Sequence, residues 1–159
     1  MSKYQVVISR NEPIDIIGIA TGVPAKVDTG AFRSAIHASN VKLKKINGQD
    51  VLTCNLLGHM AMPDSTPFET STFSTVTVVN STGHKEERYI VTLRVKVGPK
   101  VFNTTFTLAD RSKHIFPVLV GRTLLKGRFL VDVNTGSINR QQLKEQLGIK
   151  LPDNLDDLE

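Results

Sequence analysis

The chain has 159 residues, 40% of them hydrophobic, with 11 Gly and 7 Pro, which suits one globular domain. No apolar run approaches the ~20 residues that span a bilayer, the N-terminus lacks a signal segment, and the lone Cys54 excludes an internal disulfide. The formal charge of +5 lies on scattered Lys and Arg side chains without interleaved aromatics, so we expect no nucleic-acid partner. These features predict a cytoplasmic protein that does not associate with membranes.

The chain begins with two short β-branched runs. They predict strands over residues 4–9 and 14–20, bounded by turn residues at 11–13 and 21–24. Residues 25–31 follow as a third extended segment, which reads Ala-Lys-Val-Asp-Thr-Gly-Ala and places an acidic side chain at the end of an apolar run.

The next part of the chain predicts one hairpin and one loop. Residues 34–38 are extended, and residues 41–57 alternate about Asn47-Gly48, a dipeptide typical of a tight hairpin turn. Cys54 is expected there as a half-buried strand residue. Residues 58–71 contain two prolines and a Ser/Thr cluster without periodicity, so we expect a long loop.

A second hairpin follows, with a polar tip. Residues 75–79 and 88–97 flank the polar, Gly-containing residues 80–87, and the second arm alternates with a period of two. Its apolar face carries Tyr89, Val91, Leu93, Val95 and Val97. After a turn at 98–100, residues 101–108 predict another strand with Phe102, Phe106 and Leu108 on one face.

The last third of the chain predicts two strands and a helix. Residues 116–125 are an apolar run that Gly121 interrupts, followed by about one helical turn, and residues 128–133 predict a last strand. A helix is expected at about 138–147, with Ser137 as its N-cap and Gly148 as its stop, before an acidic tail from Pro152.

The candidate reactive group is the carboxylate of Asp28. Gly30 can adopt a positive φ and the hydroxyl of Thr29 can tie down the loop, as a tight connection between strands requires. An isolated Asp-Thr-Gly is more often an ordinary turn. A second, distant segment, Leu119-Val120-Gly121-Arg122 followed by Thr123-Leu124-Leu125, strengthens the catalytic interpretation.

Together these segments resemble the retropepsins, the homodimeric aspartic proteases. Within them, residues 25–31, 34–38, 110–112, 116–122 and 127–132 look like the bacterial and archaeal branch of RimB-like proteins that carries the label "ATP-dependent zinc protease". The resemblance covers roughly residues 12–134. It implies an all-β, retropepsin-like barrel, one lobe per chain, over residues 1–136, with a C-terminal helix and acidic tail over 137–159.

The resemblance also implies a role for each part of the site. The polar-tipped hairpin corresponds to the flap that closes over substrate, and the apolar-Gly segment packs behind the acidic loop. The implied catalytic residues are Asp28, Thr29 and Gly30. The implied substrate-binding residues are Ala31, Phe32, Arg33, Thr82, Gly83, His84 and Arg88. The implied structural support of the loop comes from Leu119, Val120, Gly121 and Arg122.

Chemistry then predicts a homodimer. The chain contains one Asp-Thr-Gly, whereas an aspartic protease needs two carboxylates, so two copies must meet across a two-fold axis. The two Asp28 side chains would share one proton, and the ionised one would activate a water that attacks the scissile carbonyl of a peptide or protein substrate.

No cofactor or metal is expected. The sequence lacks a His-Glu-x-x-His motif and a phosphate-binding Gly-rich loop, and its four histidines have no metal-ligand spacing. They are His37, His59, His84 and His114. Two alternatives stay open: a catalytically silent, peptide-binding module of the same fold, and the metal-dependent or nucleotide-dependent enzyme that the label implies.

One departure from the retroviral pattern affects the loop, and one charge pattern bears on substrate. Retroviral members carry an acid directly after Asp-Thr-Gly-Ala that pairs with the later arginine; here Phe32 occupies that position, so Arg122 lacks this partner. Arg33, Lys85 and Arg88 lie near the predicted cleft, either as a solvated rim or as a site that attracts acidic, glutamate-rich peptides.

Overall fold

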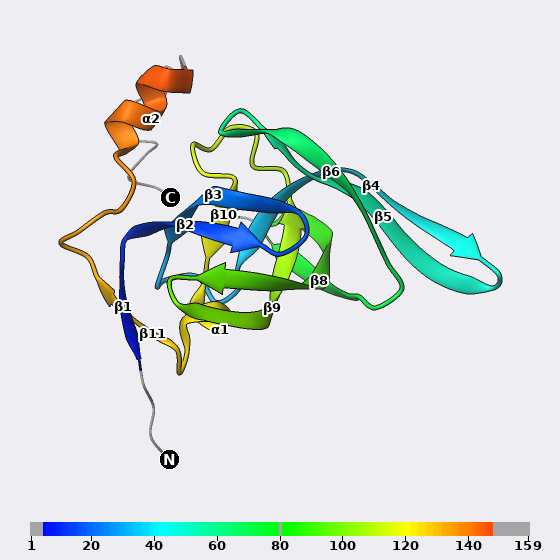
Figure 1. The fold of residues 1–159 in the computed structure, drawn as a ribbon. Helices are drawn as coiled ribbons and strands as arrows, with labels where there is room; N and C mark the ends of the chain where they lie inside the picture. The colour runs from blue at the N-terminus through cyan, green and yellow to red at the C-terminus, as the bar shows by residue number, and fades with distance from the viewer. Residues whose placement is uncertain (1–4, 80, 148–159) are drawn as a thin grey trace.

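The structure is a computed structural model that describes residues 5–79 and 81–147. It is an all-β fold with short helices (Figure 1), as predicted. The strands are β1 (Val6–Ser9), β2 (Asn11–Ile16), β3 (Ala20–Val27), β4 (Ala35–Ile46), β5 (Gln49–His59), β6 (Met62–Thr70), β7 (Ser74–Val79), β8 (Lys85–Val97), β9 (Lys100–Ala109), β10 (Val118–Val120) and β11 (Phe129–Asp132). The helices are α1 (Arg122–Leu125) and α2 (Arg140–Leu147). Neither described helix is long and apolar enough to cross a membrane.

Among the described residues, six strands close into a barrel in the order β10, β3, β2, β8, β9 and β4. The short strand β10 completes it, since it pairs in parallel with β3 and antiparallel with β4. β5 and β6 extend the sheet beyond β4, and β7 pairs with β8. A separate parallel pair, β1 with β11, lies beside the barrel.

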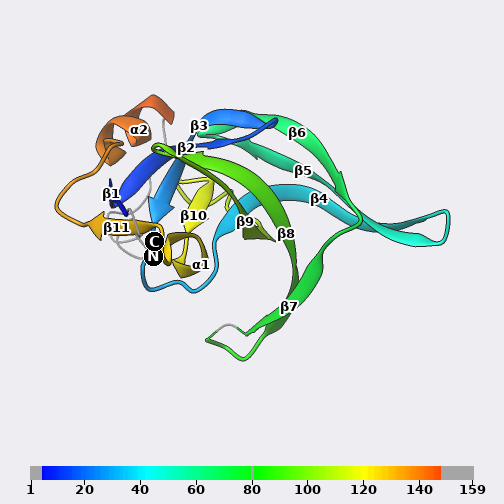
Figure 2. The same ribbon diagram turned by 60° about the horizontal axis from the view of Figure 1, so that its bottom comes forward.

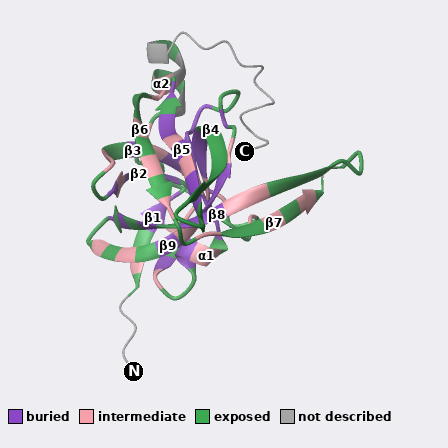
Figure 3. Cartoon of the chain, turned by 90° about the vertical axis from the view of Figure 1, so that its right-hand side faces the viewer, coloured by how far each residue is buried: buried purple, intermediate pink, exposed green. Residues whose placement is uncertain are grey.

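The core fills the barrel with side chains from alternate strand positions. In β8 the side chains of Val91, Leu93, Val95 and Val97 are buried, whereas Thr92, Arg94 and Lys96 are exposed. The predicted period of two is therefore confirmed, with Ile90 as the predicted exception. Figure 3 shows buried residues concentrated in the barrel, and exposed and intermediate residues along the hairpin formed by β7 and β8.

Two hairpins project from the barrel (Figure 2). The β4–β5 hairpin turns at Asn47 and Gly48, whose φ angles of 53° and 79° are those of a tight hairpin turn, as predicted. The second hairpin, β7–β8, carries the polar tip, and its strands pair from Ser74 with Ile90 to Val79 with Lys85.

The predicted turn positions near the N-terminus were wrong. The sequence 11–13 begins β2, the turn lies at residues 17–19, and residues 21–24 lie within β3. The prolines were mistaken for turn signals. Pro13 and Pro24 are register partners, and β8 and β10 pair with these strands only at other positions, so the missing N–H groups cost little pairing.

Three other expectations also need correction. Residues 62–70 form strand β6 rather than loop; β6 is an edge strand, which tolerates its prolines.

Cys54 is buried, not half-buried, and burial raises the pKa of its thiol to about 11. The N-cap of α2 is Asn139, whose Oδ1 accepts from the Gln142 N–H at 3.0 Å, while the Ser137 hydroxyl donates to Glu12. Gly148 and the acidic tail lie outside the described residues.

Gly121 lies where β10 passes behind the segment that follows β3. A Cβ atom added there would lie 2.5 Å from the carbonyl carbon and oxygen of Arg33 and 3.0 Å from the Ala31 oxygen. These are backbone atoms, which cannot rotate away. The close packing of two chain segments therefore requires glycine at this position.

We predict that Gly121→Ala destabilises the protein by about 3 kcal/mol, because overpacking must displace backbone. Equilibrium denaturation in urea measures the change. Gly127→Ala is the matched control: no heavy atom lies within 4 Å of its added Cβ, so only the positive φ opposes it, at about 1 kcal/mol. Equal losses in the two variants would show that the steric argument is wrong.

Candidate active site

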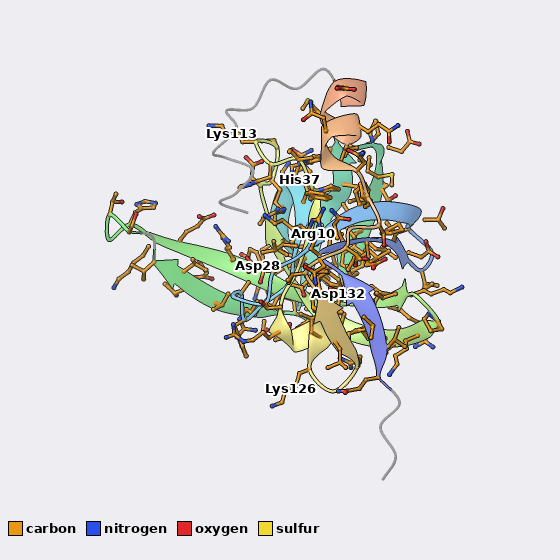
Figure 4. All side chains as sticks on the ribbon, turned by 90° about the vertical axis from the view of Figure 1, so that its left-hand side faces the viewer. Arg10, Asp28, His37, Lys113, Lys126 and Asp132 are labelled. Atoms are coloured by element: carbon orange, nitrogen blue, oxygen red, sulfur yellow. The ribbon has the colours of Figure 1, made fainter. Side chains whose placement is uncertain are left out.

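The loop that carries Asp28 begins where β3 ends. The Asp28 N–H donates to the Val120 carbonyl oxygen of β10 at 2.8 Å, and the Asp28 carbonyl oxygen accepts from Ala31 at 3.2 Å. The carboxylate Oδ1 accepts from the Gly30 N–H at 2.9 Å. The Gly30 N–H thus orients the half-buried Asp28 side chain within its own loop, and Figure 4 labels its position.

Gly30 and Thr29 act differently from the expectation. Gly30 is not among the glycines with positive φ; instead, a Cβ there would lie 3.2 Å from the Asp28 Oδ1. Glycine therefore leaves room for the carboxylate. Among the described residues, Thr29 is tied through its carbonyl oxygen, which accepts from Arg122 Nη1 at 3.1 Å, rather than through its hydroxyl.

The segment after Asp28 is held by the start of α1. The Gly121 N–H donates to the buried Ser34 Oγ at 2.9 Å. The N–H groups of Arg122 and Thr123 donate to the carbonyl oxygens of Ala31 and Phe32, at 2.9 and 3.0 Å. Val120 and Gly121 thus contact the loop through backbone bonds, and half-buried Leu119 pairs with Lys26 and Ala35.

Arg122 contacts an aromatic ring where retroviral proteins have an acid. Its Cζ lies 5.8 Å from the centroid of the Phe32 ring, and the Cζ of Arg33 lies 5.2 Å from the same centroid. Cation–π attraction of this kind stabilises exposed sites by about 0.5–1 kcal/mol. Arg122 therefore contacts both the Phe32 ring and the Thr29 carbonyl without a carboxylate.

A wide, mostly apolar hollow adjoins the loop, with a volume of about 860 Å³. It is lined by Thr29, Phe32, Arg122, Thr123, Leu125, Lys126, Phe129, Leu130 and Val131. Phe32 and Leu130 are 57% and 53% exposed, and Val7, the register partner of Leu130, is 63% exposed. We call this surface the apolar hollow; nothing in the described chain covers it.

A smaller pocket of about 220 Å³ lies between the β7–β8 hairpin and the segment after Asp28. Three arginines line it, Arg33, Arg88 and Arg111, with Asp110 as its acidic residue. The buried Nε of Arg88 has no hydrogen-bond partner among the described residues. We call this site the arginine pocket. Asp28 is not among its lining residues.

Arg111 was not predicted as a site residue. It is buried near the start of the segment that follows β9, and its Nε donates to the Phe116 carbonyl oxygen at 2.9 Å. The sequence offered one signal, the Asp110-Arg111-Ser112 motif, but nothing in the spacing indicated that the side chain would meet Arg33 and Arg88.

The structure leaves the tip residues of the β7–β8 hairpin away from both cavities. Thr82, Gly83 and His84 are exposed and line neither the apolar hollow nor the arginine pocket. Gly83 has a φ of 84°, which suits the turn. Of the expected substrate-binding residues, Arg33 and Arg88 meet in the arginine pocket, Phe32 lines the apolar hollow, and Ala31 contacts Arg122.

No group of three or more metal-ligating side chains occurs among the residues that the structure describes. Two of the histidines nevertheless meet. His37 in β4 and His59 at the end of β5 are buried, with ring centroids 5.4 Å apart. Sequence spacing could not have revealed this contact, since it depends on the pairing of β4 with β5.

Comparison with solved structures supports the barrel architecture. The chain aligns with the crystal structure of a protein of unknown function from Legionella pneumophila with a TM-score of 0.65 and 24% identity, covering 83% of this chain and 96% of that chain. At this identity, the likeness concerns the fold alone.

Curated relatives carry the domain within longer chains. A protein named "Probable alpha-L-glutamate ligase" from Desulfotalea psychrophila is 27% identical over 133 residues, covering 80% of this chain and 28% of the relative. Another of that name from Shewanella halifaxensis is 27% identical over 141 residues, covering 82% of this chain and 30% of the relative. The chain thus spans less than a third of these relatives' lengths.

A family match covers most of the chain. The sequence model described as "Retropepsin-like aspartic endopeptidase RimB" matches residues 7–142. This range contains the Asp28 loop, the β7–β8 hairpin, β10 and α1. The chain therefore belongs to the RimB-like family of retropepsin-like aspartic endopeptidases.

Proposed function

We propose that the chain is one half of a homodimeric aspartic endopeptidase in which Asp28 activates the attacking water. The observation that carries this proposal is the Asp28 loop itself. Its carboxylate is oriented by the Gly30 N–H at 2.9 Å, and its backbone is fixed to Val120 at 2.8 Å. Family membership supports the same chemistry.

Dimerisation is supported by the surface next to the loop. The apolar hollow includes Thr29 and Phe32 of that loop, so a second copy seated there would bring a second Asp28 close to the first. Exposed apolar surface of this kind is a common feature of interfaces. If no dimer forms, the runner-up is a peptide-binding module of the same fold.

In the proposed dimer, the two carboxylates would titrate as one coupled pair. Two nearby carboxylates cannot both ionise easily, so they hold one proton between them. The ionised partner accepts a proton from water as the water attacks the scissile carbonyl carbon. The protonated partner donates to the carbonyl oxygen, and no covalent intermediate forms.

For the substrate we propose an acidic, glutamate-rich peptide. Arg33, Arg88 and Arg111 converge on a pocket beneath the β7–β8 hairpin, the proposed flap. Clustered arginine side chains suit an acidic ligand, because charge-assisted bonds to carboxylates are short and strong, and Arg88 already has one carboxylate neighbour, Glu86, at 3.4 Å. The names of the curated relatives, alpha-L-glutamate ligases, agree with a role in glutamate chemistry.

We predict that Asp28→Asn lowers kcat for peptide cleavage by about 10³-fold or more, since the pair loses its general base. A peptide library that includes glutamate-rich sequences, monitored by mass spectrometry, measures cleavage, and light scattering records the oligomeric state. The variant should remain a dimer, because Asn preserves the size of the side chain. Unchanged cleavage by Asp28→Asn would refute the mechanism.

We predict that Leu130→Glu dissociates the dimer and abolishes cleavage, because it buries a charge in the apolar hollow on association. Leu43→Glu is the matched control: Leu43 is 49% exposed on the β4–β5 hairpin, against 53% for Leu130. Analytical ultracentrifugation should show monomer for Leu130→Glu alone. A wild-type monomer in all conditions would favour the binding module instead.

We predict that Arg88→Gln raises KM for a glutamate-rich peptide by about tenfold or more, as loss of a charge-assisted hydrogen bond implies. Arg94→Gln on the same strand is the control, since Arg94 is exposed and bonds Asn103 outside the pocket. Steady-state kinetics with acidic and neutral peptides separates the two. An equal effect on neutral peptides would argue against carboxylate recognition.

A further inference from the structure

The strongest unassigned feature is the buried histidine pair. His37 and His59 are 6% and 2% exposed, and their rings meet edge to face with centroids 5.4 Å apart. Titratable side chains this deeply buried are uncommon unless their polar atoms are paired. The polar atoms of the two rings should therefore be paired with other groups of the protein.

Those groups lie largely in the segment of residues 110–117, which joins β9 to β10. The Arg111 N–H donates to His37 Nδ1 at 2.9 Å. His59 Nε2 lies 2.9 Å from the Arg111 carbonyl oxygen and 2.7 Å from that of His114. The backbone N–H of His37 donates to the Pro117 carbonyl oxygen at 2.9 Å. The two rings thus hold the segment at Arg111 and His114, and the backbone N–H of His37 holds it at Pro117.

These contacts define the protonation state of both rings. His37 Nδ1 accepts from Arg111 and His59 Nδ1 accepts from the Ala61 N–H at 2.9 Å, so neither Nδ1 carries a proton. His59 Nε2 faces two carbonyl oxygens and must donate. Each ring is therefore neutral, and a proton added at Nδ1 of His37 would face the Arg111 N–H and break that bond.

We propose that His37 and His59 are positioning residues whose neutral state holds segment 110–117, and through it the Arg111 side chain, in the arginine pocket. Proton uptake by the pair releases the segment, displaces Arg111 and weakens substrate binding. The part that concerns substrate rests on the proposed function; the part that concerns the segment does not.

Burial and neighbouring positive charge oppose protonation of His37. Burial, His59 and Arg111 lower the pKa of His37, and only Asp110 raises it. The Asp110 carboxylate lies 3.9 Å from His37 Nδ1 but is 79% exposed, so water screens its charge. His114 and Arg88 also line the pocket on this side and add no negative charge.

The sign of the pH effect follows from this shift. The folded state holds the His37 proton less tightly than the unfolded state, whose pKa is about 6.5. The stabilising contribution of the neutral ring is therefore complete above about pH 6.5 and is lost as the pH falls through the lower folded pKa. Mild acid should loosen segment 110–117 first, because it contacts the pair directly.

The test compares wild type with His37→Asn and His37→Leu by amide hydrogen exchange and urea denaturation between pH 5 and 8. Asn keeps an acceptor for the Arg111 N–H and cannot titrate. In wild type, protection of the Arg111 amide should fall by up to about tenfold per pH unit below the unfolded pKa. His37→Asn should keep it independent of pH once intrinsic exchange is subtracted, and His37→Leu should lose it throughout.

Two wild-type measurements keep the proposal falsifiable if the variants do not fold. Nitrogen NMR of the His37 ring should report an unprotonated Nδ1 at pH 7, and Arg111 protection should fall as the pH drops from about 6.5 toward the pH at which this nitrogen becomes protonated. A ring protonated at pH 7 would overturn the proposal. So would the same pH dependence of Arg111 protection in His37→Asn as in wild type.

Kinetics tests the link to substrate. KM for a glutamate-rich peptide should rise in wild type as the pH falls through the lowered folded pKa of His37, with kcat less affected, and this rise should be absent in His37→Asn. An equal rise in both proteins would overturn the link. Absence of cleavage at every pH would instead refute the proposed function, while the exchange measurements would still decide the role of the pair.

Discussion

The structure depends on one packing constraint, the passage of β10 and Gly121 behind the Asp28 loop. The Asp28 N–H bonds the Val120 carbonyl oxygen, Gly121 bonds the Ser34 hydroxyl, and Arg122 bonds the Ala31 oxygen. These bonds join segments about 90 residues apart in the chain. Because β10 also pairs with both β3 and β4, the same short strand closes the barrel and orients the acidic loop. The fold and the candidate site therefore share one set of backbone bonds.

Two surfaces with opposite chemistry flank that loop. The apolar hollow on one side is lined by Phe32 and Leu130, which suits burial against another copy of the chain. The arginine pocket on the other side is lined by three arginines next to the β7–β8 hairpin, which suits an anionic ligand. Apolar burial drives association, whereas clustered charge selects ligands of opposite sign. In the proposed dimer, one loop would adjoin both the subunit interface and the substrate site.

The proposed histidine pair connects this arrangement to pH. Arg111 lines the pocket, yet its backbone is bound by His37 and His59 from strands on the far side of its segment. A change of protonation in the interior can therefore alter an exposed binding site without altering Asp28. A carboxylate pair that must hold one proton is usually favoured by a lower pH, whereas the proposed role of His37 and His59 requires neutral rings. The two requirements would therefore act in opposite directions as the pH falls.

The sequence by itself determined the strand character of the chain, the apolar face of β8, the Asn47-Gly48 hairpin and the identity of the acidic loop, because these depend on periodicity and on local turn chemistry. The sequence-based prediction placed turns at Pro13 and Pro24 and missed β6. A proline ends a strand in one setting and is tolerated within a strand in another, and the difference depends on which neighbouring strand would need its missing N–H group. Tertiary structure alone decided that Arg33, Arg88 and Arg111 line one pocket, that Arg122 lies over the Phe32 ring, and that His37 contacts His59. Each of these contacts joins residues from different strands, and their distance is set by strand pairing and barrel closure, which leave no pattern in the local sequence.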